Sequence, residues 1–402
     1  MTSFISGADF ALRDGDTVVF YGDSITDQRL YTTFAESYIV TRFPKLRVRF
    51  IHSGWGGDRV SGGGGGPIDV RLQRDVIAYK PTVMTIMLGM NDARYKPFDD
   101  QLLSEFAAGY MHIVKTVKAA LPGIRITAVQ PSPYDDVTRA PLFDTGYNAV
   151  LVRYSAHLRD LAKQENLEVA DLNTSVVAAL GKANAKDPKQ AAKMLPDRVH
   201  PGPSGHLLMA EALLKAWNAP AVVTDVAIGA AQQTATRRVG TVVAQIERVG
   251  TGLTWTQMDA ALPMPVDWKD PLIQLAADSS DFVQALDLET LQVTDLVDGT
   301  YRLTIDGEDM GTFSAAQLAG SINLAALPTP MLKQALEVAQ LTIAHNNMHF
   351  ARWRTVQVPS QKYALMKTEA TMAAMDELED ELIATQRATA QPRQHRYSLT
   401  PR

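Results

Sequence analysis

A serine follows an apolar run near the start of the chain, in the segment FYGDSITD at residues 20–27. Its hydroxyl, on Ser24, becomes a nucleophile only when a nearby base removes the proton, and an acid must orient that base. The segment PDRVHPGPSGH supplies both groups, because Asp197 and His200 stand just before a helix predicted to begin near Pro203. These three side chains are therefore a candidate nucleophile, general base and orienting carboxylate.

Hydrogen-bond donors for a negatively charged oxygen follow two other predicted strands. The segment HSGWGGDRV contains Gly54, Gly56 and Gly57, whose backbone can approach a ligand closely and point N–H groups at it. The segment LGMNDARY contains Asn91, which carries a side-chain amide donor. An acyl-transfer site needs such donors to stabilise the oxyanion of a tetrahedral intermediate. The sequence therefore predicts an oxyanion hole beside Ser24.

Structural roles compete with these chemical ones. Ser24 on its own could simply cap the helix that follows it. His206 is a second candidate for the base, but it lies among apolar residues inside a predicted helix, where a structural role is expected. Asp23 and Asp27 flank the serine, yet an acid pair that cleaves a glycosidic bond must face a sugar with both carboxyl groups. The serine and histidine explain the site better.

The elements that must position these residues alternate between short apolar runs and longer amphipathic ones, from residue 16 to about residue 217. This alternation predicts a parallel sheet covered by helices, with functional side chains at the carboxyl ends of its strands. The segment before Pro122 repeats apolar residues at helical spacing, which predicts a covering helix. The predicted strands are residues 17–22, 47–52, 82–88, 124–129 and 167–170.

Four short segments in the order GDSI, GWGGD, GMND and DRVHP, each at the end of a predicted strand or just before a helix, resemble the conserved blocks of the SGNH hydrolases, also called GDSL esterases and lipases. The resemblance covers about residues 1–220. It implies a flavodoxin-like three-layer α/β/α sandwich with a parallel sheet and an open active site. The sequence departs from the usual family pattern at His52, where asparagine is common.

The resemblance also implies a role for each site residue. Ser24 would be the nucleophile, His200 the general base and Asp197 the partner that orients it. The oxyanion would be held by the backbone N–H groups of Ser24 and Gly57 and by the amide of Asn91. Neither a metal ion nor an organic cofactor would be needed.

The remaining half of the chain changes in character after Trp217. Alternating segments and two Asp-Gly turn signals predict a smaller β-rich unit, and two long amphipathic segments after it predict helices. The predicted division is a catalytic domain at 1–222, a β-rich accessory domain at 223–328 and a helical region at 329–402. The basic, proline-containing tail from residue 389 is expected to be flexible.

Several other features are weaker signals. His345 and His349 have the spacing of metal ligands on a helix, but no third ligand is apparent and no metal is predicted. The glycine-rich run at 61–67 lacks the Gly-Lys-Ser/Thr of a phosphate loop and is interpreted as a mobile loop beside the site that could admit a bulky substrate. Trp255 and Trp268 could stack on a sugar, but buried aromatic side chains are commoner in a small β unit.

Composition limits the partners. The net charge of −5, with 39 basic and 44 acidic residues, gives no basic face for nucleic acid, and the absence of cysteine excludes disulfide and thiolate chemistry. No apolar stretch is long enough to span a membrane. Residues 1–16 lack the features of a signal peptide. Localisation is therefore left open: cytoplasmic as the sequence stands, secreted or periplasmic if a signal was removed.

The predicted function is a serine carboxylic-ester hydrolase of short acyl groups, foremost acetyl, that works through an acyl-enzyme intermediate. The substrate would be a small acyl ester or an acetylated glycan. The alternative is a catalytically inactive carbohydrate-binding or interaction protein on the same scaffold, which the retention of Ser24, Asp197 and His200 disfavours. Nothing indicates an apolar lid for long-chain lipids. A homo-oligomer through the C-terminal helices is left open.

Overall fold

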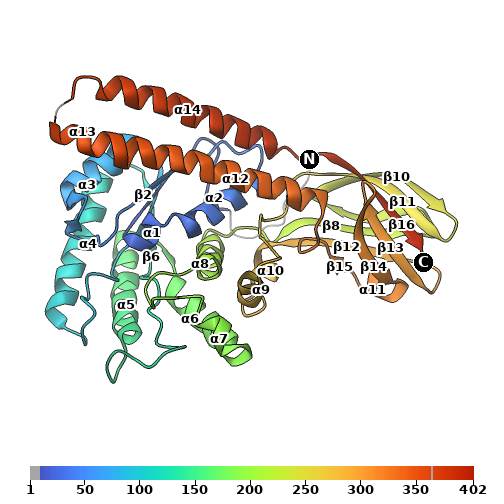
Figure 1. The fold of residues 1–402 in the computed structure, drawn as a ribbon, viewed down its shortest axis with the longest axis horizontal. Coiled ribbons are helices and arrows are strands. Elements are labelled where there is room, and N and C mark those ends of the chain that lie inside the picture. Colours follow the sequence, from blue (N-terminus) through green and yellow to red (C-terminus); the bar gives the residue numbers. More distant parts are fainter. Residues whose placement is uncertain (1–9, 364) are drawn as a thin grey trace.

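The computed structural model describes residues 10–363 and 365–402 (Figure 1). A parallel sheet of five strands lies at the centre of the first half of the chain, in the order β2-β1-β5-β6-β7. Neighbouring strands of this sheet are parallel throughout. The strands are β1 Thr17–Gly22, β2 Arg49–Gly54, β5 Val83–Met87, β6 Arg125–Val129 and β7 Glu168–Ala170. All five predicted strands are confirmed, within a few residues at each end.

Helices cover both faces of this sheet, which makes a three-layer α/β/α sandwich. The chain moves one way from β1 to β2 and the other way from β5 to β7, so right-handed crossovers place the connecting helices on opposite faces. Helices α2 and α8 pack on each other on one face, and α4 and α5 on the other. These helices are α2 Leu30–Arg42, α8 Pro203–Ala216, α4 Asp100–Ala120 and α5 Tyr147–Glu165. The predicted flavodoxin-like fold is confirmed.

Apolar side chains on the sheet and on the facing stripes of the helices form the core. In α4 the predicted stripe points inward, with Phe106, Tyr110, Ile113 and Val117 all buried. The Asp99 side chain caps this helix by accepting hydrogen bonds from the backbone N–H groups of its first turn. Shorter elements complete the unit: α1 Ser24–Asp27, β3 Gly62–Gly63, β4 Gly66–Pro67, α3 Ile68–Asp75, η1 Ile77–Tyr79, α6 Leu172–Lys186 and α7 Pro188–Ala191.

A β-rich unit follows, in which two sheets share a second apolar core. One sheet has the strand order β10-β11-β16-β13-β14 and the other β15-β12-β8-β9. The first sheet contains β10 Thr241–Val249, β11 Gly252–Asp259, β16 Gln394–Pro401, β13 Thr300–Ile305 and β14 Glu308–Ser314. The second contains β15 Ile322–Asn323, β12 Leu288–Thr294, β8 Val222–Gly229 and β9 Thr234–Val239. A short helix, α11 Ala315–Ala319, lies between β14 and β15.

The expectation of a flexible tail is wrong. Helix α14 ends at Thr389, and strand β16 then enters the β-rich unit between β11 and β13. The side chains of Tyr397 and Leu399 are buried, and the Tyr397 ring stacks on Trp255 with 5.0 Å between centroids. Basic and proline residues concealed this alternation of buried and exposed positions, which is the pattern of a strand with one buried face.

Residues between β11 and β12 leave the β-rich unit and pack on the α/β core. Helices α9 Pro271–Ala277 and α10 Phe282–Leu286 belong to this segment. Its apolar side chains, among them Val266 and Phe282, join the core of the first half of the chain. The two halves of the chain are therefore joined by apolar packing as well as by their covalent connection. The predicted boundaries at residues 222 and 328 stay a prediction.

Two long antiparallel helices extend from the β-rich unit across the α/β unit and return (Figure 1). We call residues 330–389 the C-terminal hairpin. It consists of α12 Pro330–Phe350, a π-helical turn η2 Ala351–Gln357, α13 Val358–Tyr363 and α14 Thr368–Thr389. Strand β15 precedes this hairpin and strand β16 follows it, so the β-rich unit holds both of its ends.

A buried ionic cluster attaches the hairpin to the α/β unit. The Glu36 carboxylate, on α2, bonds to His345 Nε2 of α12 at 2.5 Å and to His52 Nε2 of β2 at 3.1 Å. The Glu379 carboxylate, on α14, lies 3.7 Å from His345 Nδ1 and 3.5 Å from His349 Nδ1. Buried charges are tolerated when they are paired in this way. His52, where the sequence departs from the family pattern, is thus a buried structural residue.

We predict that this cluster makes folding stability depend on pH. Burial opposes the charge on His345, but Glu36 and Glu379 outweigh that effect and raise its pKa from 6.5 to about 9. The charged histidine therefore stabilises the folded state below about pH 6.5, and this contribution is lost as pH rises through 9. The free energy of unfolding should fall over that interval by up to about 3 kcal/mol.

Urea unfolding at several pH values tests this prediction. The fall between pH 6.5 and 9 should be clearly smaller in His345→Gln than in the wild type, whereas His112→Gln, which changes an exposed histidine, should keep the full fall. Burial lowers the pKa of the neighbouring His52, so His52 does not produce the same trend. An equal pH dependence in the wild type and in His345→Gln would contradict the prediction.

Candidate active site

Ser24 lies at the carboxyl end of β1, where β2 and β5 flank this strand on opposite sides. Because the chain leaves β1 and β5 toward opposite faces of the sheet, a crevice forms at such a switch point, where α/β proteins bind ligands. Ser24 is the first residue of α1, and Asp23 caps this helix by accepting a hydrogen bond from the Ile25 N–H at 3.0 Å. The fold thus presents the Ser24 side chain at the crevice.

Ser24, His200 and Asp197 form one hydrogen-bonded chain. Ser24 Oγ lies 2.8 Å from His200 Nε2, although the two residues are 176 positions apart in the sequence. His200 Nδ1 lies 2.7 Å from Asp197 Oδ2. An ionised carboxylate only accepts hydrogen bonds, so we assign the ring proton to Nδ1, which leaves Nε2 to accept from the serine hydroxyl. The order of these groups is that of a nucleophile, a base and an orienting acid.

Asp197 is held ionised by its surroundings. Partial burial raises the pKa of its carboxyl, but hydrogen bonds from His200 and Val199 outweigh burial, and the pKa lies below its usual value. Asp197 Oδ1 accepts from the backbone N–H groups of Val199 and His200 at 3.0 and 2.7 Å. The aspartate therefore fixes the backbone of the loop as well as the imidazole ring.

His206, the competing base candidate, lies in the interior. Its ring stacks parallel to Tyr31, Nδ1 accepts from the Tyr31 backbone N–H, and Nε2 lies 3.0 Å from Gln28 Oε1. Burial lowers the pKa of His206 to about 3, so the ring stays neutral at any ordinary pH. These contacts give His206 a structural role.

The loop that follows β2 lies next to Ser24. A Cβ atom added to Gly56 would lie 4.0 Å from Ser24 Cβ, so the loop after β2 is in contact range of the nucleophile. Gly57 is exposed and has a φ of +78°, a conformation that favours glycine. At Gly54 a Cβ atom would lie 2.2 Å from the Asp27 backbone nitrogen, so only glycine allows β2 to end this close to α1.

Asn91 comes from the loop after β5 and is oriented on both sides. Its Nδ2 donates to the Asp58 carbonyl at 3.1 Å, and its Oδ1 accepts from the Tyr95 hydroxyl at 3.2 Å. An amide nitrogen carries two hydrogens, and the bond to Asp58 uses one of them. The structure thus brings the loops that contain Gly57 and Asn91 together through Asp58.

Two residues near the site were not identified from the sequence. Tyr95 follows Arg94, and both have a φ of +55°, which is uncommon for residues with side chains and is typical of functional loops. Arg354 comes from the hairpin and pairs with Asp27, their closest atoms 3.5 Å apart. Short-range sequence patterns contain no signal for either feature.

The glycine run at 61–67 supports Trp55. Strands β3 and β4 form a small hairpin there. A Cβ atom on Gly65 would lie 2.7 Å from the Trp55 ring, and one on Gly64 would lie 3.0 Å from its Nε1. The glycines therefore allow the indole to lie directly against the backbone of this hairpin, beside the Gly56 and Gly57 loop.

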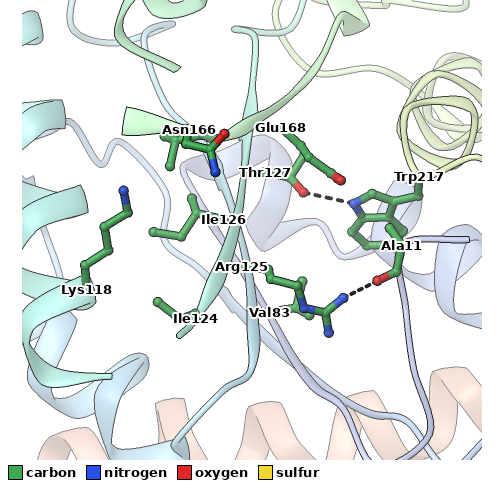
Figure 2. A pocket seen from close by; sticks show the side chains of 11 residues that line it. Ala11, Val83, Lys118, Ile124, Arg125, Ile126, Thr127, Asn166, Glu168 and Trp217 are labelled. Carbon is green, nitrogen blue, oxygen red and sulfur yellow. Dashed lines mark hydrogen bonds between the residues drawn. The ribbon is translucent and has the colours of Figure 1, made fainter. Parts of the chain in front are cut away.

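A cavity lies at the opposite end of the central sheet. This cavity has a volume of about 350 Å³ and is lined in part by residues at the amino ends of β5, β6 and β7, whereas Ser24 lies at the carboxyl end of β1. Figure 2 shows the side chains that line it. Trp217 donates to Thr127 across this cavity at 2.9 Å. Within residues 10–363 and 365–402, no group of three His, Cys, Asp or Glu side chains is arranged to hold a metal ion. No helix in the same part of the chain is long and apolar enough to cross a membrane.

Comparison with known proteins agrees with this geometry. The model of the GDSL-like lipase/acylhydrolase family matches residues 20–208. An acetylxylan esterase from Geobacillus stearothermophilus is 25% identical over 222 residues, which cover 50% of this chain and 93% of that protein. The crystal structure of Axe2, an acetylxylan esterase from the same organism, is also similar, with 25% sequence identity and a TM-score of 0.42. The matched residues cover 52% of this chain and 96% of the Axe2 chain.

A solved structure of a gut microbial diltiazem-metabolizing enzyme resembles the whole chain. It is 27% identical, covers 97% of this chain and 98% of its own, and has a TM-score of 0.85. The β-rich unit and the C-terminal hairpin are therefore shared with a known enzyme, together with the α/β unit. Residues 20–208 form a domain of the GDSL-like (SGNH) lipase/acylhydrolase family, and the chain is accordingly a hydrolase of the esterase type.

Proposed function

We propose that the protein is a serine carboxylic-ester hydrolase that removes short acyl groups, foremost acetyl groups. The observation that carries this proposal is the hydrogen-bonded chain from Ser24 Oγ through His200 to Asp197, with distances of 2.8 and 2.7 Å. A serine hydroxyl that meets the unprotonated nitrogen of an imidazole can lose its proton as it attacks a carbonyl carbon.

The proposed acylation begins when Ser24 Oγ attacks the ester carbonyl carbon and transfers its proton to His200 Nε2. The carbonyl oxygen becomes an oxyanion, stabilised by the N–H groups of Ser24 and Gly57 and by the Asn91 amide. Asp197 stabilises the imidazolium that forms. As the C–O bond to the alcohol breaks, His200 returns the proton to the leaving oxygen, and the acyl group remains on Ser24.

Deacylation repeats these steps with water. His200 Nε2 takes a proton from a water molecule, whose oxygen attacks the acyl carbon. The second tetrahedral intermediate uses the same donors, and its collapse returns the proton to Ser24 Oγ and releases the carboxylic acid. Apart from the ester and the water molecule, every group named in these steps belongs to the chain itself.

The relatives support an acetyl ester as the substrate. The matched Geobacillus proteins are acetylxylan esterases, and the enzyme that resembles the whole chain metabolises diltiazem. The alternative of an inactive carbohydrate-binding protein has less support. Trp255 is buried in the core of the β-rich unit, and the half-buried Trp268 donates to the Ala325 carbonyl at 3.1 Å. Neither indole is presented as an open platform for a sugar.

We predict that Ser24→Ala abolishes turnover. Hydrolysis should be measured on p-nitrophenyl esters from acetyl to dodecanoyl, on acetylated xylan and on diltiazem. The wild type should prefer the shortest esters, and the variant should lose about 10⁶-fold in kcat. Ser175→Ala, which changes an exposed serine on α6, should match the wild type. Undiminished hydrolysis by Ser24→Ala would refute the assignment of the nucleophile.

We predict that Asn91→Ala lowers kcat by about 10²- to 10³-fold with little change in KM, because it removes one oxyanion donor among several. Tyr95→Phe keeps the amide and removes only the bond that orients it, so the loss should be smaller. Steady-state kinetics with p-nitrophenyl acetate measures both effects. If Asn91→Ala keeps the kcat of the wild type, the side-chain amide is not an oxyanion donor.

A further inference from the structure

A π-helical turn in the first arm of the C-terminal hairpin lies against the active-site loop. This turn, η2 Ala351–Gln357, directly continues helix α12, and π-helical turns are rare in proteins but frequent at functional sites. Trp353 in this turn is buried, and its Nε1 donates to Asp75 Oδ1 at 2.6 Å. The Trp353 ring also meets Trp55 edge-on, with 5.5 Å between ring centroids. The turn is therefore packed against the loop that follows β2.

Arg354, the next residue, makes three contacts with the active-site segments. Its guanidinium carbon lies 3.4 Å from the centroid of the Trp55 ring, which is a close cation–π contact. Its Nη1 lies 3.5 Å from Asp27 Oδ1 and donates to the Gly54 carbonyl at 3.4 Å. Asp27 closes helix α1, which begins at Ser24, and Gly54 ends strand β2. Arg354 thus joins the nucleophile segment to the oxyanion loop.

Asp27 extends this connection to the donors themselves. Its Oδ1 faces Arg354, and its Oδ2 accepts a hydrogen bond from the Gly56 backbone N–H at 3.2 Å. The next peptide in the chain carries the N–H of Gly57. Asp27 and Arg354 have only 21% and 19% of their side chains exposed, so solvent screens this pair weakly. Without Arg354, the Asp27 carboxylate would lose its ion-pair partner. The loop after β2 would also lose the contacts that Arg354 makes with Gly54 and Trp55.

A second set of contacts with Trp55 also supports the loop. The glycine hairpin of β3 and β4 contacts the indole there, and the buried Arg71 lies 5.3 Å from the ring centroid. Arg71 is fixed by carboxylates, with its Nε 2.7 Å from Asp58 Oδ2 and its Nη1 bonded to Asp75. Trp55 is thus contacted by the glycine hairpin and Arg71 of the α/β unit and by Arg354 of the C-terminal hairpin.

We propose that Arg354 is a positioning residue for ester hydrolysis. By holding Trp55 and Asp27, it fixes the loop from Gly54 to Gly57 in the geometry that receives the oxyanion. The C-terminal hairpin is then a part of the active site, and the β-rich unit anchors that hairpin at both ends. This inference rests on the proposed function, because it assigns Arg354 an action through the proposed oxyanion donors.

The first test is the steady-state kinetics of p-nitrophenyl acetate hydrolysis by the full chain. Arg354→Met should lower kcat by about 10- to 100-fold, because small displacements of catalytic groups cost rate, and KM should change less than about 3-fold. Arg354→Lys, which keeps the charge beside Asp27 and loses the planar stacking, should be intermediate. Lys367→Met, a change of an exposed cation at the same end of the hairpin, should leave kcat and KM unchanged.

A transition-state analogue separates positioning from a merely structural role. An alkyl trifluoromethyl ketone would form a tetrahedral adduct on Ser24, and its inhibition constant should rise in Arg354→Met by the factor by which kcat/KM falls. Asp27→Asn should show the same pattern, and the double variant should lose less than the product of the two single losses. Circular dichroism and the thermal midpoint check that each variant is folded.

The outcomes distinguish the two proposals. Turnover that survives Ser24→Ala overturns the proposed function itself. Turnover that depends on Ser24 but is unchanged in both Arg354→Met and Asp27→Asn overturns only the positioning role. A rise in KM with an unchanged kcat, or losses in the two single variants that multiply in the double variant, would also overturn that role. If Arg354→Met does not fold, Arg354→Lys and Asp27→Asn provide the same comparison.

Discussion

The proposed chemistry depends on the hydrogen bond between Ser24 Oγ and His200 Nε2. A single hydrogen bond contributes only about 1 kcal/mol to stability, so it cannot bring together two segments 176 residues apart. The rigid elements around it must do so. Strand β1 ends at the switch point of a largely buried sheet, and α8 begins directly after the loop that carries His200. Asp197 binds the backbone of that loop as well as the imidazole. The contacts of Asp197 therefore hold the loop in its folded conformation and also orient the imidazole for the proposed reaction.

Two clusters of buried ionic groups hold the C-terminal hairpin and the residues beneath Trp55 in place. One cluster joins Glu36, His345 and Glu379 between α2 and the C-terminal hairpin, and another joins Arg71 to Asp58 and Asp75 beneath Trp55. Such pairs contribute little net stability compared with apolar packing, but removing one partner costs about 3–5 kcal/mol because a buried charge is left alone. They therefore specify where the hairpin lies more than how stable it is. The proposed role of the loop after β2, which is to present N–H groups to an oxyanion, requires such precision.

Much of the α/β unit could be predicted because its signals are local. Buried parallel strands are continuous apolar runs, and Ser24, Asn91 and His200 stand beside short segments with recognisable spacing. Strand β16 was missed because its alternation lies among basic residues, which concealed one buried face. Arg354 could not be found in this way, because it meets Asp27 across 327 positions of sequence and through a π-helical turn. Likewise, nothing local indicates that His345 would meet Glu36 rather than a metal ion.

The most direct test of the central claim is to identify the residue that reacts as the nucleophile. The protein should be treated with diethyl p-nitrophenyl phosphate, which phosphorylates serine nucleophiles that are activated by a base, and then digested and mapped by mass spectrometry. The account predicts one diethylphosphoryl group, on Ser24, with loss of esterase activity in proportion to labelling. It also predicts far slower labelling in His200→Ala. A label on another residue that tracks the loss of activity, with Ser24 unmodified, would contradict it.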